Sequence, residues 1–267
     1  FDHIIPYLQK GDLLVLNNSK VLPVRLFGQK ENTGGKVEAL LIKPVYQNQW
    51  KVLLKPGKRI HPGSRILFSS ELVGEVLNKY EPEGSYLVCF ETKGSFLEIV
   101  NRIGQMPTPP YIKKKLTHDS NYQTVYASKE GSIAAPTAGL HFTQELLLNI
   151  KKAGINITYL TLHVGRGTFE KIRVNQIEKH KMLPEYYTIS AENENIVNQT
   201  IQQGNRIIAV GTSATRALES SASGNKVNRG SRSTDLFIYP GYQFKIVNAL
   251  ITNFHLPRSS PLMLASA

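Results

Sequence analysis

Short apolar segments separated by polar turns dominate the first third of the chain. The segments "VEALLI", "WKVLL", "SRILF", "LVGEVL" and "SYLVCF" fall between Val21 and Phe90, and stretches such as "NTGG" and "KPGKRIHPG" separate them. Strands of this length and spacing are typical of a small antiparallel barrel or sandwich. The pattern therefore predicts a compact all-β domain over residues 21–100, followed by a short helix at "SFLEIVNRIG".

The rest of the chain alternates between helical and strand spacing. Thr143 and Gly154 bound one predicted helix, and Ser190 and Gly204 bound a second. The apolar face of the first helix is formed by Leu146, Leu147, Ile150 and Ala153. Buried strands are predicted at "GDLLVLNNSK", "INITYLTLHV", "RIIAVG" and "FKIVNALIT", and a third helix starts at "TSATRALES". This order predicts an α/β domain with a mixed or mainly parallel sheet over residues 1–20 and 101–267, into which the barrel is inserted.

Two polar segments are predicted to be loops. Residues 220–234 are rich in serine and glycine, and we expect them to be mobile. The segment "QMPTPPYIKKK" has three prolines that cannot continue a helix, and its lysines are either phosphate contacts or a solvated connector.

The charge balance narrows the class of partner. The 267 residues carry 32 Lys and Arg against 20 Asp and Glu, a formal net charge of +12. Such an excess suits a polyanion such as tRNA, although an inert basic surface would have the same composition. A single cysteine excludes an internal disulfide and favours a reducing cytoplasm. No leader or membrane-spanning run is recognisable, and the missing initiator methionine suggests a fragment.

Four predicted strand ends are each followed by a small polar or glycine-rich loop. These loops are residues 17–20, 163–169, 211–216 and 253–257. Because ligands bind at the carboxyl ends of strands in open α/β sheets, we expect the loops to share one crevice. The loop "HVGRGTF" lacks the third glycine of a dinucleotide fingerprint, and there is no phosphate-binding GK[ST] motif. Both absences disfavour nicotinamide and ATP enzymes.

Three histidines lie in or beside these loops. His141, His163 and His255 are candidates for acid and base catalysis, because imidazole titrates near neutral pH; each could instead pack or cap. Their spacing fits no zinc motif, so we expect no metal. Asp235 either orients a loop, holds a histidine or accepts a ribose hydroxyl. In "IAAPTAGLHFT", Ala134, Ala135, Ala138 and Gly139 would keep side chains out of the crevice.

Read together, these segments resemble the S-adenosylmethionine:tRNA ribosyltransferase-isomerases of queuosine biosynthesis. The matching stretches span nearly the whole chain in order: "GDLLVLNNSKVLPVRLFG", "MPTPPYI", "YQTVYA", "AAPTAGLHFT", "TLHVGRGTF", "GNRIIAVGTSATRALES", "DLFIYPGYQFKIVNALITNFHLP" and "LMLASA". The chain departs from the family at Lys20, where arginine is common, and at Pro261. It also lacks the family's N-terminal segment and C-terminal extension.

The resemblance implies an α/β domain with an inserted barrel and an unusual use of S-adenosylmethionine. Its ribosyl carbons are transferred to 7-aminomethyl-7-deazaguanine at the tRNA wobble position, which gives epoxyqueuosine and releases adenine and methionine. S-adenosylmethionine would be a co-substrate, with no prosthetic group, and we expect a monomer. The sulfonium acidifies C5′, the acceptor amine must be neutral, and adenine leaves more easily once protonated.

These requirements give each candidate residue a hypothetical role. His141 and His163 would share the acid and base steps with His255 as a third candidate, and Asp235 and Thr137 would orient substrate or imidazole. The expected walls for S-adenosylmethionine are Pro136, Gly139, Gly165, Gly167, Thr168, Gly211, Thr212 and Ser213. The expected phosphate contacts are Lys113, Lys114, Lys115, Arg166 and Arg216. An RNA methyltransferase and a catalytically silent RNA-binding module remain the alternatives.

Overall fold

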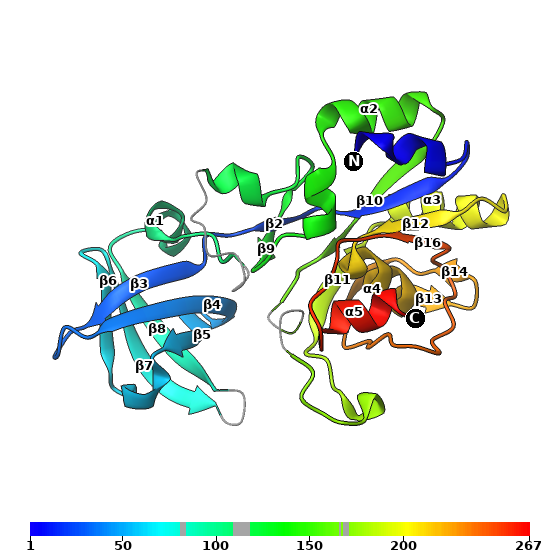
Figure 1. Ribbon diagram of the computed structural model, residues 1–267. Helices are drawn as coiled ribbons and strands as arrows, with labels where there is room; N and C mark the ends of the chain where they lie inside the picture. The colour runs from blue at the N-terminus through cyan, green and yellow to red at the C-terminus, as the bar shows by residue number, and fades with distance from the viewer. Residues whose placement is uncertain (81–83, 109–117, 166, 168–170) are drawn as a thin grey trace. The chain divides into compact units, whose positions relative to one another are not determined.

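A computed structural model describes residues 1–80, 84–108, 118–165, 167 and 171–267, and the chain divides into two compact units (Figure 1). The α/β unit consists of residues 1–21 and 116–267, and the barrel unit of residues 22–115. The predicted fold class is confirmed, since one unit is a mixed sheet with helices and the other a closed antiparallel barrel. Residues 101–115, which the sequence assigned to the α/β domain, group with the barrel.

The α/β unit is built on a six-stranded sheet in the order β15-β11-β10-β1-β12-β16. These strands are β1 (Leu13–Asn17), β10 (Asn156–Leu162), β11 (Glu185–Ile189), β12 (Ile207–Val210), β15 (Gly230–Thr234) and β16 (Ala249–Ile251). The four strands β10, β1, β12 and β16 are parallel neighbours, whereas β11 and β15 pair antiparallel at one edge. The carboxyl ends of these four strands, which the sequence predicted to precede polar loops, therefore lie at the same end of the sheet.

Helices cover both faces of this sheet, as Figure 1 shows for α2 and α4. The α-helices are α2 (Gln144–Lys152), α3 (Ala191–Gln202), α4 (Thr212–Ser221) and α5 (Ser260–Ala265). The short 3₁₀ helices are η1 (Asp2–Tyr7), η3 (Asp119–Tyr122), η4 (Thr137–His141) and η6 (Ile177–Lys179). Two further small sheets pair β2 (Ser19–Val21) with β9 (Lys129–Ser132), and β13 (Ala222–Ser223) with β14 (Lys226–Val227).

Alternation along β1 divides the core of the α/β unit into two layers. Leu13 and Val15 pack in one cluster with residues of α3 and α4, whereas Leu14 and Leu16 pack in another with residues of α2. All four side chains are at most 1% exposed. Such burial on both faces is typical of central parallel strands, and it explains their continuous apolar sequence.

The predicted helix boundaries follow from local capping chemistry. Thr143 accepts a hydrogen bond from the Leu146 amide, and Ser190 accepts one from the Asn193 amide. Gly154 has a φ of +82°, the left-handed conformation that favours glycine after a helix. Ala153 is a correction: it is exposed at the end of α2, since the buried face ends at Ile150.

The barrel unit closes in the order β3-β4-β5-β8-β7-β6. Its strands are β3 (Arg25–Lys30), β4 (Lys36–Tyr46), β5 (Gln49–Lys55), β6 (Arg65–Ser69), β7 (Leu72–Tyr80) and β8 (Ser85–Thr92). The 3₁₀ helix η2 (Gly57–Arg59) and the helix α1 (Phe96–Ile103) complete it. Alternate residues of β7, Leu72, Gly74 and Val76, are buried, as expected for a strand that turns one face toward the core.

Two segments of the α/β unit differ from the sequence-based prediction. Residues 220–234, predicted to be a mobile loop, form the end of α4, the β13–β14 hairpin and β15. These strands lie at edges, so most of their side chains face solvent and need no apolar pattern. The strand predicted at "FKIVNALIT" is limited to β16. In the described part of the chain, no helix has the length and hydropathy to cross a membrane.

Candidate active site

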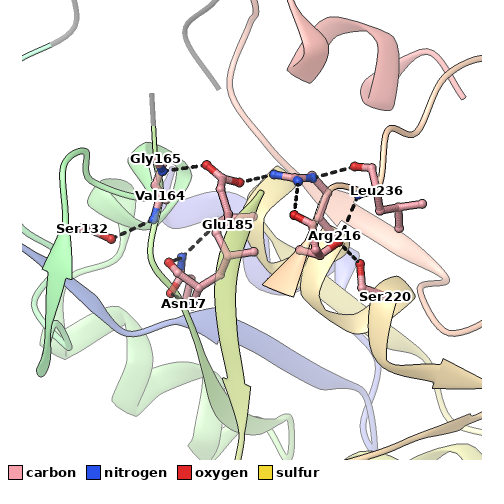
Figure 2. Close-up of polar contacts among 11 residues, drawn as sticks. Asn17, Ser132, Val164, Gly165, Glu185, Arg216, Ser220 and Leu236 are labelled. Atoms are coloured by element: carbon pink, nitrogen blue, oxygen red, sulfur yellow. Dashed lines mark hydrogen bonds and ion pairs between the residues drawn. The ribbon is translucent and has the colours of Figure 1, made fainter. Parts of the chain in front are cut away.

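Asn17, which is labelled in Figure 2, links three of the four parallel strand ends through the hydrogen bonds of its side chain. Its fully buried amide donates to the Leu162 carbonyl oxygen at 2.9 Å and to Ser213 Oγ at 3.1 Å. Its Oδ1 atom accepts from the Leu162 amide at 3.0 Å. The Gly211 amide donates to the Ile251 carbonyl oxygen, which joins the fourth strand end. The loops after β1, β10, β12 and β16 therefore begin at one continuous edge, although the sequence had not singled out Asn17.

His141 and Thr137 are joined through Asn253, which sequence reasoning also missed. Asn253 donates its amide to Thr137 Oγ1 at 3.0 Å, and its Oδ1 lies 2.9 Å from His141 Nε2. In this orientation the Asn253 oxygen is the acceptor, and His141 Nε2 donates to it. The His141 ring is exposed and stacks on Phe1 with ring centroids 5.2 Å apart. This imidazole is thus oriented and open to solvent.

His163 has a drier environment directly after β10. Its ring lies against Gly131, where an added Cβ would approach Nδ1 to 2.9 Å. The Nδ1 atom is buried and has no hydrogen-bond partner among the described residues. Desolvation lowers the pKa of His163 below its usual value of 6.5. The backbone is fixed on both sides, because His163 donates to the Tyr186 carbonyl and Val164 to Ser132 Oγ. This imidazole is held neutral at neutral pH.

His255 belongs to the same loop as Asn253. Its Nε2 atom lies 2.9 Å from Thr252 Oγ1, and burial lowers its pKa. Among the described residues, no hydrogen bond joins His163 to either of the other two histidines. The structure therefore places His141 and His255 beside one loop through their bonding partners, and His163 at a separate strand end of the same sheet edge.

Arg216 is a correction to the predicted phosphate contacts. It is only 6% exposed, and its guanidinium binds the carboxylate of Glu185, which is 2% exposed. It also donates to the Leu236 carbonyl oxygen at 2.9 Å and to the Thr234 carbonyl oxygen at 3.4 Å. The positive charge predicted to face RNA is neutralised inside the unit. Asp235 lies between these two carbonyls in the sequence, and its side chain is exposed.

The small residues around His141 have a packing role. An added Cβ at Gly139 would lie 2.0 Å from the Tyr126 hydroxyl oxygen, so only glycine fits there. Ala134, Ala135 and Ala138 are at most 4% exposed, and Pro136 is buried as well. These residues pack inside the unit and do not line an open crevice, contrary to the expectation from sequence.

The start of α4 retains the features of a ligand-binding helix end. Gly211 has a φ of +88°, which favours glycine, and Thr212 and Ser213 are half-buried behind it. The N-cap residue is glycine and has no side chain that could cap the helix, so the first amides of α4 lack intrahelical partners, as at the start of any helix. Gly165 packs against Glu185, and Gly167 is buried against Leu183.

Some predicted site residues lie outside the described part of the chain. They are Thr168 of the loop after β10 and the predicted phosphate contacts Lys113, Lys114, Lys115 and Arg166. Within the described residues, no three His, Cys, Asp or Glu side chains are grouped in a way that could hold a metal ion.

Comparison with known proteins gives consistent relatives. A family model described as queuosine biosynthesis protein matches residues 1–267. Three curated proteins named S-adenosylmethionine:tRNA ribosyltransferase-isomerase are similar over 100% of this chain and 79% of their own length. The protein of Acetivibrio thermocellus is 52% identical, and those of Halothermothrix orenii and a Thermoanaerobacter species are each 49% identical. A crystal structure of S-adenosylmethionine tRNA ribosyltransferase from Thermotoga maritima is 34% identical, covers 100% of this chain and 75% of that one, and has a TM-score of 0.47.

Proposed function

This chain belongs to the family of queuosine biosynthesis proteins, and we propose that it is a ribosyltransferase-isomerase acting on S-adenosylmethionine and tRNA. It transfers and isomerises the ribosyl group of S-adenosylmethionine onto 7-aminomethyl-7-deazaguanine at the wobble position, and it releases adenine and methionine. The observation that carries this proposal is an identity of about half over the whole chain to proteins of that name. The polar loops that follow β1, β10, β12 and β16 at one end of the sheet support a site for this chemistry there.

His163 is the residue best suited to remove a proton from C5′ beside the sulfonium. Its pKa is lowered by desolvation, so the ring is neutral and able to accept a proton at neutral pH. Because this base is neutral, it does not repel the positively charged sulfonium in a site from which water is partly excluded. The nitrogen of the acceptor amine then forms a bond to a ribosyl carbon, the carbon–sulfur bond breaks to release methionine, and the bond to the base breaks to release adenine, which takes up a proton.

His141 is the counterpart proposed for proton transfer at the departing adenine or the attacking amine. Its ring is exposed, and Asn253 fixes its orientation through the bond to Nε2. Thr137 contributes indirectly, since it holds the Asn253 amide. His255 remains a third candidate in the same loop, and Asp235 is the proposed acceptor for a ribose hydroxyl.

The start of α4 is the proposed site for the carboxylate of the methionine part. The first amides of a helix have no intrahelical partners, and the partial positive charge of the helix end favours an anion. Gly211, Thr212 and Ser213 would contact this group, with Gly165, Gly167 and Thr168 as the other proposed walls. Pro136 is buried and would support these walls without touching the ligand. The buried packing of Gly139 limits its part to shaping the wall from behind.

The tRNA contacts are proposed for Lys113, Lys114, Lys115 and Arg166. The net charge of +12 supports an electrostatic share in binding, so affinity for tRNA should fall as salt rises. A single cysteine fits the reducing cytoplasm in which tRNA is modified. We expect a monomer.

Product analysis tests the proposed reaction. The protein is incubated with S-adenosylmethionine and tRNA bearing 7-aminomethyl-7-deazaguanine, and small products are separated by chromatography. We expect adenine and methionine in equal amounts, with epoxyqueuosine in the digested tRNA. Formation of S-adenosylhomocysteine would indicate a methyltransferase instead, and tRNA binding without any turnover would indicate a silent RNA-binding module.

A further inference from the structure

A buried ion pair joins the segments that carry the proposed site. Glu185 is the first residue of β11, and its Oε1 atom accepts a hydrogen bond from the Gly165 amide at 2.6 Å. Its other oxygen binds Arg216 Nη1, as Figure 2 shows. Both side chains are less than a tenth exposed, so solvent does not screen the pair. The carboxylate thus ties the loop after β10 to α4.

The guanidinium extends this connection to a further segment. Arg216 lies one turn into α4, and its Nε and Nη2 atoms donate to the carbonyl oxygens of Leu236 and Thr234. These two residues flank Asp235. The Thr234 hydroxyl is also hydrogen-bonded to the hydroxyl of Ser220, near the end of α4. Through one pair of side chains, α4 is fixed to the segments that contain Asp235 and Gly165.

Stability alone gives no reason to retain such a pair. Two charges lose their hydration when they are buried, and well-packed apolar side chains of similar volume are often as stable or more stable. What the pair adds is direction, because a planar guanidinium and a carboxylate fix the atoms that they bond within narrow angles. The backbone atoms fixed here belong to the loop that begins with His163 and to the segment around Asp235.

We propose that Glu185 and Arg216 are positioning residues that set Gly165, just after β10, and the Asp235 segment against α4. They hold the S-adenosylmethionine site in its reactive geometry before the ligand arrives. This inference rests on the proposed function. Both side chains are buried, so we expect neither to touch the substrate. They act through the backbone atoms of Gly165, Thr234 and Leu236 that they bind.

Glu219 provides a matched control within the same helix. It is another buried carboxylate, and it accepts hydrogen bonds from the backbone amides of Lys245, Ile246 and Val247. That segment precedes β16 and therefore lies at the amino ends of the parallel strands, whereas the proposed site lies at their carboxyl ends. A Glu219→Gln variant removes one buried carboxylate while leaving the loops of the site tied.

The test compares Glu185→Gln, the double variant Glu185→Gln with Arg216→Met, and Glu219→Gln. Adenine release gives kcat and KM for S-adenosylmethionine, calorimetry gives its Kd, and thermal unfolding gives the folded fraction. Because a misplacement of about 1 Å can lower a rate roughly 10²-fold, we expect kcat/KM per folded molecule to fall by about that factor in Glu185→Gln. Glu219→Gln should lower Tm with kcat/KM per folded molecule unchanged.

The double variant separates positioning from stability. It removes both buried charges, so we expect its Tm to recover relative to Glu185→Gln while kcat/KM stays about as low. Recovery of both Tm and kcat/KM would overturn the proposal, as would equal losses in Glu185→Gln and Glu219→Gln. If the unaltered protein released no adenine, the proposed function would fail. The Kd for S-adenosylmethionine would then still decide whether the pair shapes a binding site.

Discussion

The two units of the molecule differ in what they bury. The α/β unit encloses four charged side chains, Asp12, Glu185, Arg216 and Glu219, each bonded to another segment of the chain. Among the described residues of the barrel unit no charged side chain is buried, and the buried polar groups are the hydroxyls of Ser85 and of Tyr86, which donates to the Gly57 carbonyl oxygen. An apolar interior needs only the right volume and pattern, whereas buried polar groups need specific partners. The α/β unit is therefore the one whose buried side chains require specific partners in a defined geometry.

The largest expected effect is on the rate of adenine release when one histidine in each unit is replaced. His163→Ala should lower adenine release by roughly 10²- to 10⁴-fold, because a placed general base is lost. His61 is exposed in a turn of the barrel unit, and His61→Ala should leave the rate unchanged. Initial rates of adenine release at saturating S-adenosylmethionine measure both. Near-normal turnover by His163→Ala would remove this residue from the proposed mechanism.

The second prediction compares how much the free energy of unfolding falls when one arginine in each unit is replaced. Arg216→Met leaves Glu185 buried without its ionic partner, and we expect the free energy of unfolding to fall by about 3–5 kcal/mol. In the barrel unit, Arg65 pairs with Glu91 and Glu31 at the surface, where water and salt screen the charges. Urea unfolding of Arg65→Met should therefore show a much smaller change. Equal losses in the two variants would contradict the distinction between the units.

The third prediction weakens the barrel without touching the proposed site. Leu72 is fully buried in β7, and Leu72→Ala should cost about 2–5 kcal/mol of stability through the cavity that it leaves. At temperatures where the variant stays folded, we expect the Kd for S-adenosylmethionine to equal that of the unaltered protein. A weakened Kd in titration calorimetry would show that the barrel contributes to this site.

The smallest effect is a pH dependence that originates in the α/β unit. Burial lowers the pKa values of His163 and His255 below 6.5, so the unfolded chain binds more protons than the folded one below that pH. The free energy of unfolding should be highest above about pH 6.5, should decrease as the pH falls from there toward the lowered pKa values, and should level off below them. Adenine release should fall over the same range, as His163 becomes protonated.

Variants at the two histidines assign this pH dependence. In His255→Asn, the acid limb of the kcat/KM profile should persist, because His163 is intact. An acid limb that disappears with His255 would transfer the role of base to that residue. Stability measured by urea unfolding at each pH separates loss of folded protein from loss of the base.

The local pattern of apolar and polar residues was sufficient to predict most helices and strands, but it did not predict the side-chain contacts between them. The barrel strands and the caps Thr143 and Ser190 follow from residues close in sequence. Asn17 bonds to Leu162, 145 positions away, and such a partner leaves no local signal. Arg216 was expected at the surface because a cation without a visible partner is normally solvated, yet Glu185 lies 31 positions away. The polar edge strand β15 was missed for the related reason that its solvent-facing residues carry no apolar pattern.

Amide hydrogen exchange with and without S-adenosylmethionine tests most directly whether the α/β unit holds the ligand. The first amides of α4 have no intrahelical partners and the N-cap glycine has no side chain to cap them, so we expect them to exchange faster than the middle of the helix in the free protein. On addition of S-adenosylmethionine we expect protection at Thr212, Ser213 and the amides that follow His163, with the barrel strands unchanged. Protection confined to β3–β8, with none at the start of α4, would contradict the account.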